Sequence, residues 1–324
     1  MFLRSRIAQV TIAAAVFLIL GSTLPPLYNN QARPLATDLN LEVRAEQDGT
    51  TYTRHTTTSP AEKDSVARAT STVELAQDGK TIVRISEDSL LNRESTYPVA
   101  GTNTTQSITI PELGVDTADQ ESERNGMSYF FPSGAEQRSY PFFDPLTQDS
   151  APIDFLRDEK LDGIPTYVFH QELQPAALAD VLGTDQHRSG PASDFYSPES
   201  LQRFDLKANS HVILEPFYAV SRTVWVEPTT GTIVNEEEHP RIFWATDAAQ
   251  AEAMVAADDT QERALVDVPL AWSAETRTER LDAVRQVITT VKLLSIVGWL
   301  GKTVGVVLLA VAAAMYMRHR AQDA

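Results

Sequence analysis

The sequence contains no cysteine. Disulfide bonds, cysteine-ligated zinc, iron–sulfur clusters and thiol nucleophiles are therefore excluded. It also lacks a His-x-x-x-His pair, a Gly-x-Ser-x-Gly elbow and a phosphate-binding glycine loop, which would indicate a metalloprotease, a serine hydrolase or a nucleotide site. We identify no catalytic, cofactor-binding or metal-binding residue, and expect a non-enzymatic protein without cofactors.

Basic residues are few compared with acidic ones. The 324 residues include 27 Lys and Arg against 44 Asp and Glu. Residues 28–292 hold 22 of these bases and 43 of these acids, a formal charge of −21. A surface this acidic repels phosphate backbones, so we expect no nucleic-acid partner. The acidic excess also favours solubility, which is the simpler interpretation.

Charge is almost absent from two long apolar segments. The first, residues 7–24, follows Arg4 and Arg6 and spans about 27 Å as a helix. We expect the helix to stop at Pro25-Pro26, because proline disrupts a helix interior. A cleaved signal peptide has the same basic start and apolar centre, but no clean small-x-small cleavage site precedes the prolines. We favour an uncleaved transmembrane helix, and cleavage stays open as the alternative.

The second apolar segment, residues 298–317, is also long enough to span a bilayer, at roughly 30 Å. Lys302 is the one charged residue within it. Its long stem can carry the ammonium to the headgroups, which is the interpretation we favour. The alternative is that Lys302 lines a polar pathway or pore. No acidic partner lies in either segment.

The charges that flank the two segments predict a two-pass topology in the cell membrane. Arginines lie in the N-terminal tip, residues 1–6, and in the C-terminal tail, residues 318–324. The positive-inside rule places both in the cytoplasm and residues 28–272 outside it. Arg285 and Lys292 lie on the expected outer side and oppose this assignment. We retain it because the first span normally dominates.

The extracytoplasmic residues 28–272 have the pattern of an antiparallel β domain. Thr, Val, Ile and Tyr recur in short segments that suit pleated sheet. Asp-Gly pairs at residues 48–49, 78–79 and 162–163 mark turns between strands. We predict a mainly β (α+β) fold with a transmembrane helix at each end. The expected strands are residues 39–43, 50–54, 71–76, 81–85, 166–171, 220–226 and 232–235.

The pattern changes towards the C-terminus. Residues 183–198 are rich in Gly, Pro, Ser and Asp and predict a loop. Residues 245–257 are rich in alanine and predict a helix, and residues 264–272 predict one more strand, with Pro269 indicating an edge. Apolar residues then recur at spacings of three and four over residues 273–297. They predict a juxtamembrane amphipathic helix whose apolar stripe packs on the β domain, the membrane surface or another copy.

Two acidic clusters and one serine are the remaining polar candidates. The first cluster lacks the spacing of an EF-hand, so a solvated loop is favoured over a Ca²⁺ site. The second, residues 236–239, follows a strand and is interpreted as a solvated edge. Ser133 lies in a Pro-Ser-Gly segment, which favours a turn over a nucleophile. The first cluster consists of Asp154, Asp158, Glu159 and Asp162.

Aromatic residues concentrate in a short part of the β domain. Large aromatic side chains dominate cores, so the core of the domain is the favoured interpretation. The alternative hypothesis is an apolar groove that holds an acyl chain. The residues that would line this groove are Tyr129, Phe130, Phe131, Tyr140, Phe142, Phe143, Phe155, Tyr167 and Phe169.

Four segments of the chain resemble a known family. They are Gly-Met-Ser-Tyr-Phe-Phe-Pro at 126–132, Tyr-Pro-Phe-Phe-Asp at 140–144, residues 161–169, and Ser-Arg-Thr-Val-Trp-Val-Glu-Pro-Thr-Thr-Gly-Thr-Ile-Val at 221–234. Together they resemble an actinobacterial family that was first a domain of unknown function and is now labelled PorA-type porin. The resemblance covers essentially the whole chain. It implies an actinobacterial cell envelope and a porin label, and it assigns no site residue.

A pore places physical demands on such a chain. Backbone polar groups cannot face lipid unpaired, so an aqueous channel needs a closed barrel or a ring of helices. Two helices per chain cannot enclose one. A porin built on these segments would therefore be a homo-oligomer, with Lys302 facing the lumen.

Three hypotheses about function follow. We favour a membrane-anchored envelope protein whose β domain binds a lipid, a glycolipid or a protein partner. The second hypothesis is the oligomeric channel. The third is an envelope hydrolase whose residues, such as Ser133, Asp154, Glu236 and His239, meet only in space, as the carboxylates of glycosidases do.

Overall fold

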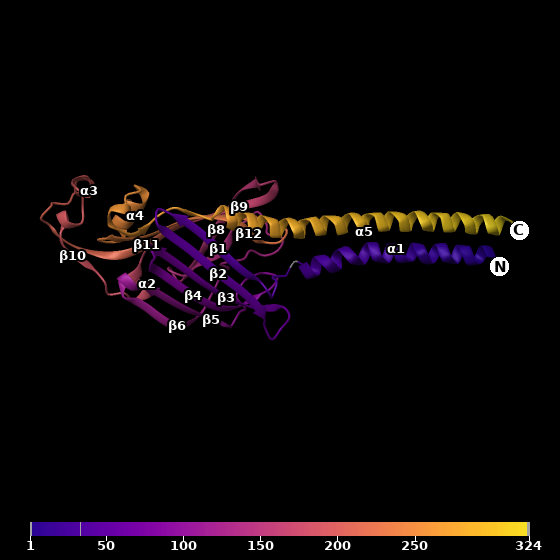
Figure 1. Cartoon of the computed structure of the whole chain (residues 1–324), viewed down its shortest axis with the longest axis horizontal. Helices are drawn as coiled ribbons and strands as arrows, with labels where there is room; N and C mark the ends of the chain where they lie inside the picture. Colours follow the sequence, from indigo (N-terminus) through magenta and orange to yellow (C-terminus); the bar gives the residue numbers. More distant parts are fainter. Residues whose placement is uncertain (1, 33, 323–324) are drawn as a thin grey trace. The chain divides into compact units, whose positions relative to one another are not determined.

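The computed structural model describes residues 2–32 and 34–322, which form two units (Figure 1). We call residues Leu35–Asp282 the β unit, and Met1–Pro34 with Ala283–Ala324 the helical unit. Residue 1 of the expected N-terminal tip and residues 323–324 of the expected tail lie outside the described residues.

The first sheet of the β unit is a meander in which each strand pairs antiparallel with the next. Every second residue of β5 is buried, as expected of a sheet with one buried face. The 3₁₀ turn η1 (Pro111–Leu113) joins the last two strands. The strands are β1 (Asn40–Gln47), β2 (Thr50–Pro60), β3 (Val66–Gln77), β4 (Lys80–Asn92), β5 (Asn103–Ile110) and β6 (Val115–Glu123).

Asp-Gly pairs form the tight turns of this sheet. Asp48 and Gly49 have φ angles of 49° and 76°, and Asp78 and Gly79 have the same values. Positive φ at both central residues is the requirement of a type I′ hairpin turn, which Asp and Gly tolerate best. A third pair, Asp162-Gly163, makes the same turn between β8 (Asp149–Leu161) and β9 (Ile164–Ala177). The three predicted turns are confirmed.

The second sheet runs in the order β13-β12-β11-β9-β8-β7, with β10 paired to β11 and β14 paired to β12. All its pairings are antiparallel. Both sheets are open, with unclosed edges. Because the strands of both sheets pair antiparallel, the predicted mainly β, antiparallel fold is confirmed. The strands are β7 (Tyr140–Asp144), β8 (Asp149–Leu161), β9 (Ile164–Ala177), β10 (Arg188–Pro191), β11 (His211–Glu227), β12 (Thr232–Ala245), β13 (Ala264–Asp267) and β14 (Leu270–Ala271).

Short helices fill the connections of the second sheet, namely α2 (Leu178–Leu182), α3 (Pro198–Arg203), α4 (Ala248–Ala256) and the 3₁₀ turns η2 (Ala192–Asp194) and η3 (Gln261–Arg263). The helix predicted over residues 245–257 is confirmed by α4. Two predictions need correction. The expected loop at 183–198 contains β10, because β11 extends far enough to offer it a partner. The single strand expected at 264–272 is split into β13 and β14 around Pro269, which has no N–H to donate to a ladder.

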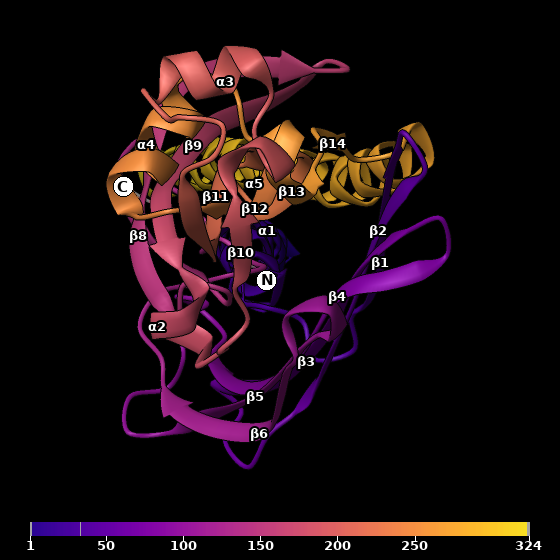
Figure 2. The same ribbon diagram turned by 90° about the vertical axis from the view of Figure 1, so that its left-hand side faces the viewer.

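The two sheets of the β unit face each other across a shared core (Figure 2). Aliphatic side chains from both sheets meet there, such as Leu75 and Ile85 from the first and Leu214, Val220 and Ile242 from the second. Each of these five side chains is at most 5% exposed. Burial of apolar area at this interface, at about 25 cal/mol per Å², is the main force that holds the sheets together.

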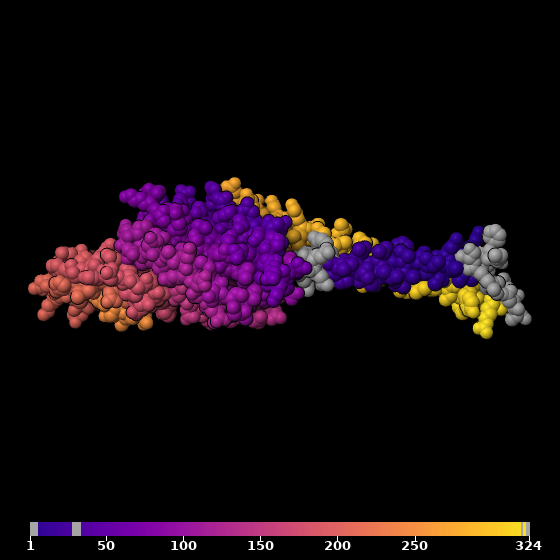
Figure 3. Space-filling model, turned by 90° about the horizontal axis from the view of Figure 1, so that it is seen from below, coloured from indigo at the N-terminus to yellow at the C-terminus, as the bar shows by residue number. Residues whose placement is uncertain are grey.

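The helical unit pairs α1 (Phe2–Ala32) with the larger part of α5 (Ala274–Gln322), and the two helices lie side by side (Figure 3). The expectation that Pro25-Pro26 end the first helix is wrong, because α1 continues through both to Ala32. Proline removes a helical hydrogen bond, but its fixed φ is itself helical, and a neighbouring helix makes such interruptions tolerable. The segments Arg6–Leu27 and Ala274–Arg318 are long and apolar enough to cross a membrane.

The two helices touch through glycines. A Cβ atom on Gly21 would lie 2.7 Å from the Gly298 carbonyl oxygen and 2.9 Å from the Lys302 backbone nitrogen. Only glycine permits this approach, which is typical of helix pairs in membranes. The side chain of Lys302 itself is exposed, so the pairing within one chain does not bury it.

Candidate functional site

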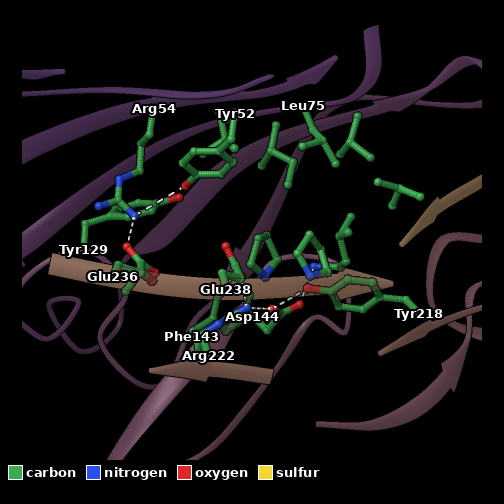
Figure 4. Close-up of a pocket in the computed structure, with 18 of the residues that line it drawn as sticks. Tyr52, Arg54, Leu75, Tyr129, Phe143, Asp144, Tyr218, Arg222, Glu236 and Glu238 are labelled. Atoms are coloured by element: carbon green, nitrogen blue, oxygen red, sulfur yellow. Dashed lines mark hydrogen bonds and ion pairs between the residues drawn. The ribbon is translucent and has the colours of Figure 1, made fainter. Parts of the chain in front are cut away.

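A cavity of about 90 Å³ lies between the two sheets of the β unit (Figure 4). Figure 4 shows Tyr52, Arg54 and Leu75 on one side of it, and Glu236 and Glu238 on a strand at the other side. Each sheet contributes both aliphatic and ionisable side chains to the lining of the cavity. The aliphatic residues that line it are Val73 and Leu75 of β3, Val83 and Ile85 of β4, Ile242 of β12 and Val266 of β13.

Strand alternation places these side chains. Successive residues of a strand point to opposite faces, so every second residue of β12 faces the first sheet. Glu236, Glu238, Pro240 and Ile242 share that face and line the cavity, whereas Glu237 is exposed on the other face. One strand thus presents carboxyls and apolar groups to the same cavity.

An ion pair joins the two sheets at the cavity. Arg54 Nη1 of β2 lies 3.2 Å from Glu236 Oε2 of β12, and the two side chains are 8% and 7% exposed. The guanidinium carbon also lies 5.3 Å and 5.6 Å from the ring centroids of Tyr129 and Trp272. Burial raises the pKa of the nearby Tyr52 phenol, so that this hydroxyl remains protonated.

A second cluster surrounds Arg222 of β11. Its Nη2 lies 2.5 Å from Asp144 Oδ2 and 2.9 Å from Glu238 Oε1, and its Nη1 donates to Gln171 Oε1 at 3.1 Å. The Tyr218 hydroxyl donates to Asp144 Oδ2 at 3.1 Å. One guanidinium therefore forms ion pairs with two carboxyls inside the domain.

Among these carboxyls, Glu238 has the weakest stabilisation of its negative charge. Asp144 Oδ1 accepts the backbone N–H groups of Leu146 and Thr147 in addition to the bonds to Oδ2. Glu238 shares Arg222 with Asp144, and burial raises the pKa of the Glu238 carboxyl, with a smaller opposite effect from Arg222. The cavity thus contains a carboxyl that favours its neutral form more than an exposed glutamate does.

The predicted groove residues divide between several places. Tyr129, Phe142 and Phe143 line the cavity. Phe130 packs with Ala69 and Leu91 instead. A packed aromatic cluster, with ring centroids 4.8–6.1 Å apart, holds Phe131, Tyr140, Phe142, Phe155, Tyr167 and Phe169.

The structure gives the four residues considered for hydrolysis different partners. Ser133 Oγ donates to the Thr230 carbonyl at 3.1 Å, and Ser139 Oγ donates to Asp154. His239 Nε2 lies 2.6 Å from Asp267 Oδ1, whereas Glu236 pairs with Arg54. Glu236 alone of these four lines the cavity.

The two acidic clusters also differ from expectation. Residues 154 and 158 are exposed and residue 159 is half-buried on β8, and residue 162 is exposed in the following turn, so the first cluster lies mostly on a strand rather than in a loop. Within the described residues, no group of three or more His, Cys, Asp or Glu could hold a metal ion. The interpretation of residues 236–239 as a solvated edge is wrong for Glu236, which is 6% exposed. The reason is that β12 lies inside the sheet, between β11 and β13.

The residues predicted for a site do not include the charged residues Arg54, Asp144 and Arg222. A signal for Arg222 exists, because Val220, Arg222 and Val224 share one strand face and are all at most 5% exposed. A basic residue on the strand face that otherwise carries apolar residues predicts a buried cation. Its anionic partner cannot be read from the same pattern.

Comparison with known proteins gives one family. The family model described as Porin PorA matches residues 7–314. A protein named Porin PorA from Corynebacterium resistens is 28% identical over 285 residues, which cover 75% of this chain and 69% of that protein. Another with the same name, from Corynebacterium amycolatum, is 33% identical over 171 residues, or 50% of this chain and 44% of that protein.

We predict that Arg54→Met destabilises the β unit by about 3–5 kcal/mol, because Glu236 stays buried without its cation. The measurement is urea unfolding of the detergent-solubilised protein, followed by tryptophan fluorescence. Arg68→Met is the matched control: the pair of Arg68 with Asp88 is 56% and 37% exposed, so its loss should change stability by less than about 1 kcal/mol. The double variant Arg54→Met/Glu236→Leu should recover part of the loss. Equal effects of the two single variants would contradict the assignment.

Proposed function

Since this chain belongs to the PorA porin family, we propose that it is a non-enzymatic membrane protein of the cell envelope whose β unit binds a lipid or glycolipid outside the cytoplasm. The inter-sheet cavity carries the ligand part of this proposal. The two apolar helices and their flanking charges support the topology.

The topology rests on the distribution of charge. The arginines of residues 1–6 and of residues 318–324 flank the two apolar helices on their outer ends. The positive-inside rule then gives two spans with both termini in the cytoplasm. The acidic β unit, which connects the spans, lies on the opposite side of the membrane in this proposal.

Cysteine labelling tests this topology, since the chain has no cysteine of its own. Glu62→Cys lies in an exposed connection of the β unit, and Ala321→Cys lies in the exposed last turn of α5. In intact spheroplasts, a membrane-impermeant maleimide should label position 62 and leave position 321 unlabelled until the membrane is permeabilised. The reverse pattern would refute the proposed topology.

The ligand proposal follows from the chemistry of the cavity walls. Binding sites combine apolar walls with a few fixed polar groups, and this cavity has aliphatic residues of β3 and β4 opposite Glu236 and Glu238. Its volume of about 90 Å³ is less than the ~150 Å³ of an engineered cavity that binds benzene. It therefore takes one end of an amphiphile, and the rest of the molecule lies outside.

Filling the cavity should remove the ligand. Val73→Phe adds a ring to its aliphatic wall, and we expect about tenfold weaker binding, equivalent to about 1.4 kcal/mol. Native mass spectrometry of the full-length protein, extracted in mild detergent, measures the co-purifying lipid or glycolipid. Val66→Phe, on the same strand but outside the cavity lining, is the control and should retain the ligand. Wild-type protein without any bound amphiphile would count against the proposal.

An oligomeric channel is the second candidate, and the names of the two relatives favour it. The β unit has open sheets around a packed core, so a water-filled pathway would have to form between helices of several copies. The exposed Lys302 within the apolar part of α5 could then face the lumen.

Planar-bilayer recordings of the purified full-length protein test this candidate. If Lys302 lines a pore, Lys302→Glu should raise the cation-to-anion permeability ratio, because a charged ring selects ions of opposite sign. Lys292→Glu, outside the expected span at residues 298–317, should change selectivity less. Absence of any conductance would eliminate the channel hypothesis.

A further inference from the structure

The inter-sheet cavity contains more acidic than basic groups. Its ionisable side chains with a formal charge at neutral pH are two guanidiniums, Arg54 and Arg222, and three carboxyls, Asp144, Glu236 and Glu238. We propose that the cavity binds the ammonium group of an amphiphilic amine, with Glu238 as its counter-ion. This inference rests on the proposed ligand-binding function and specifies the chemical class of the ligand.

Glu238 is the carboxyl that is available to a ligand. Asp144 is saturated by two backbone N–H groups, the Tyr218 hydroxyl and Arg222. Glu236 has Arg54 as its own partner. Glu238 has one ion pair, to a guanidinium nitrogen that it shares with Asp144, and its side chain is 18% exposed. It therefore presents carboxylate surface to the cavity, which the Tyr52 and Tyr129 rings also line.

The residues that line the cavity favour an organic cation over an anion or a metal ion. An anion would meet three carboxyls, while both arginines already have acidic partners. A metal ion requires several oxygen or nitrogen ligands, and no such group occurs among the residues that the structure describes. An alkylammonium fits both kinds of lining residue: its charge pairs with Glu238, and its carbons contact Val73, Val83 and their aliphatic neighbours.

Below the raised pKa of Glu238, binding exchanges a proton for the ligand. In the empty cavity the Glu238 carboxyl retains its proton to a higher pH than usual, because burial disfavours its charge. An arriving ammonium pairs with the carboxylate, and the carboxyl proton leaves to solvent. Affinity for the amine should therefore increase as pH rises towards the raised pKa of Glu238, and level off above it. The charged and titratable groups facing Glu238 are Arg222 and Tyr218 of β11, Asp144 of β7, Glu236 of β12, and Arg54 and Tyr52 of β2.

The experiment compares three probes of equal length on the full-length protein in detergent. Isothermal titration calorimetry with n-butylammonium, 1-butanol and butyrate should show the ammonium binding at least about tenfold more tightly than the alcohol, and butyrate more weakly than either. Glu238→Gln should remove the preference for ammonium and retain alcohol binding. Glu237→Gln, the exposed neighbour on the opposite face of β12, should behave as wild type.

The results separate this inference from the function on which it rests. If lipid or butanol binds, and Val73→Phe weakens that binding about tenfold, but ammonium has no advantage, the amine assignment is wrong and the ligand-binding function stands. If no amphiphile and no probe binds, both fail. If Glu238→Gln does not fold, the wild-type protein still decides: titration of butylammonium in buffers of different ionisation enthalpy must show proton release below the pKa of Glu238, and its absence overturns the proposal.

Discussion

The burial of charge between two β-sheets is the constraint on which the β unit depends. Arg54 on the first sheet and Glu236 on the second are both less than a tenth exposed, and each compensates the desolvation of the other. A buried pair of this kind contributes little net stability, and well-packed apolar residues often replace it without loss. Its effect is specificity: any other relative position of the sheets would leave two buried ions unpaired. Asp144 and Arg222 form a second buried pair, but both lie in the second sheet, so this pair fixes β7 relative to β11 and not one sheet relative to the other.

These buried ion pairs also explain why the interior of the β unit is not one continuous apolar core. Aliphatic side chains of both sheets form one core, and aromatic side chains around Phe131 and Phe169 form another. The cavity lies where Arg54, Arg222 and Glu238 line the space between the sheets, because ionisable groups cannot interdigitate as closely as apolar ones without losing solvation. A ligand that supplies both charge and carbon atoms matches both the ionisable and the aliphatic residues of the cavity. The packed aromatic rings leave less room for an acyl chain than the cavity does.

The helical unit differs from the β unit in its packing and in the chemistry of its surface. Glycine contacts between Gly21 and Gly298 allow backbones to approach closely, and much of the remaining surface of both helices is apolar and exposed. In water such a surface would be unfavourable, whereas lipid is as apolar as the side chains themselves. The solvated carboxylates of the β unit require water for the same reason. The proposed topology assigns each unit the solvent that its surface needs, and any channel would have to be built from several copies.

Local patterns in the sequence determined the hairpins, the antiparallel sheets and the two apolar helices. Asp-Gly pairs impose positive φ, strand alternation has a fixed period, and apolar length is set by bilayer thickness. Two predictions from local patterns are wrong. The first helix does not end at Pro25-Pro26, because α1 continues through both prolines. Glu236 is not on a solvated edge, because β12 lies within the sheet. The tertiary structure alone decided the site, because Arg54 and Glu236 are 182 positions apart and Arg222 and Asp144 are 78 apart. Periodicity shows which face of a strand is buried, but the partner of a buried charge depends on which strands share a sheet and which sheets meet.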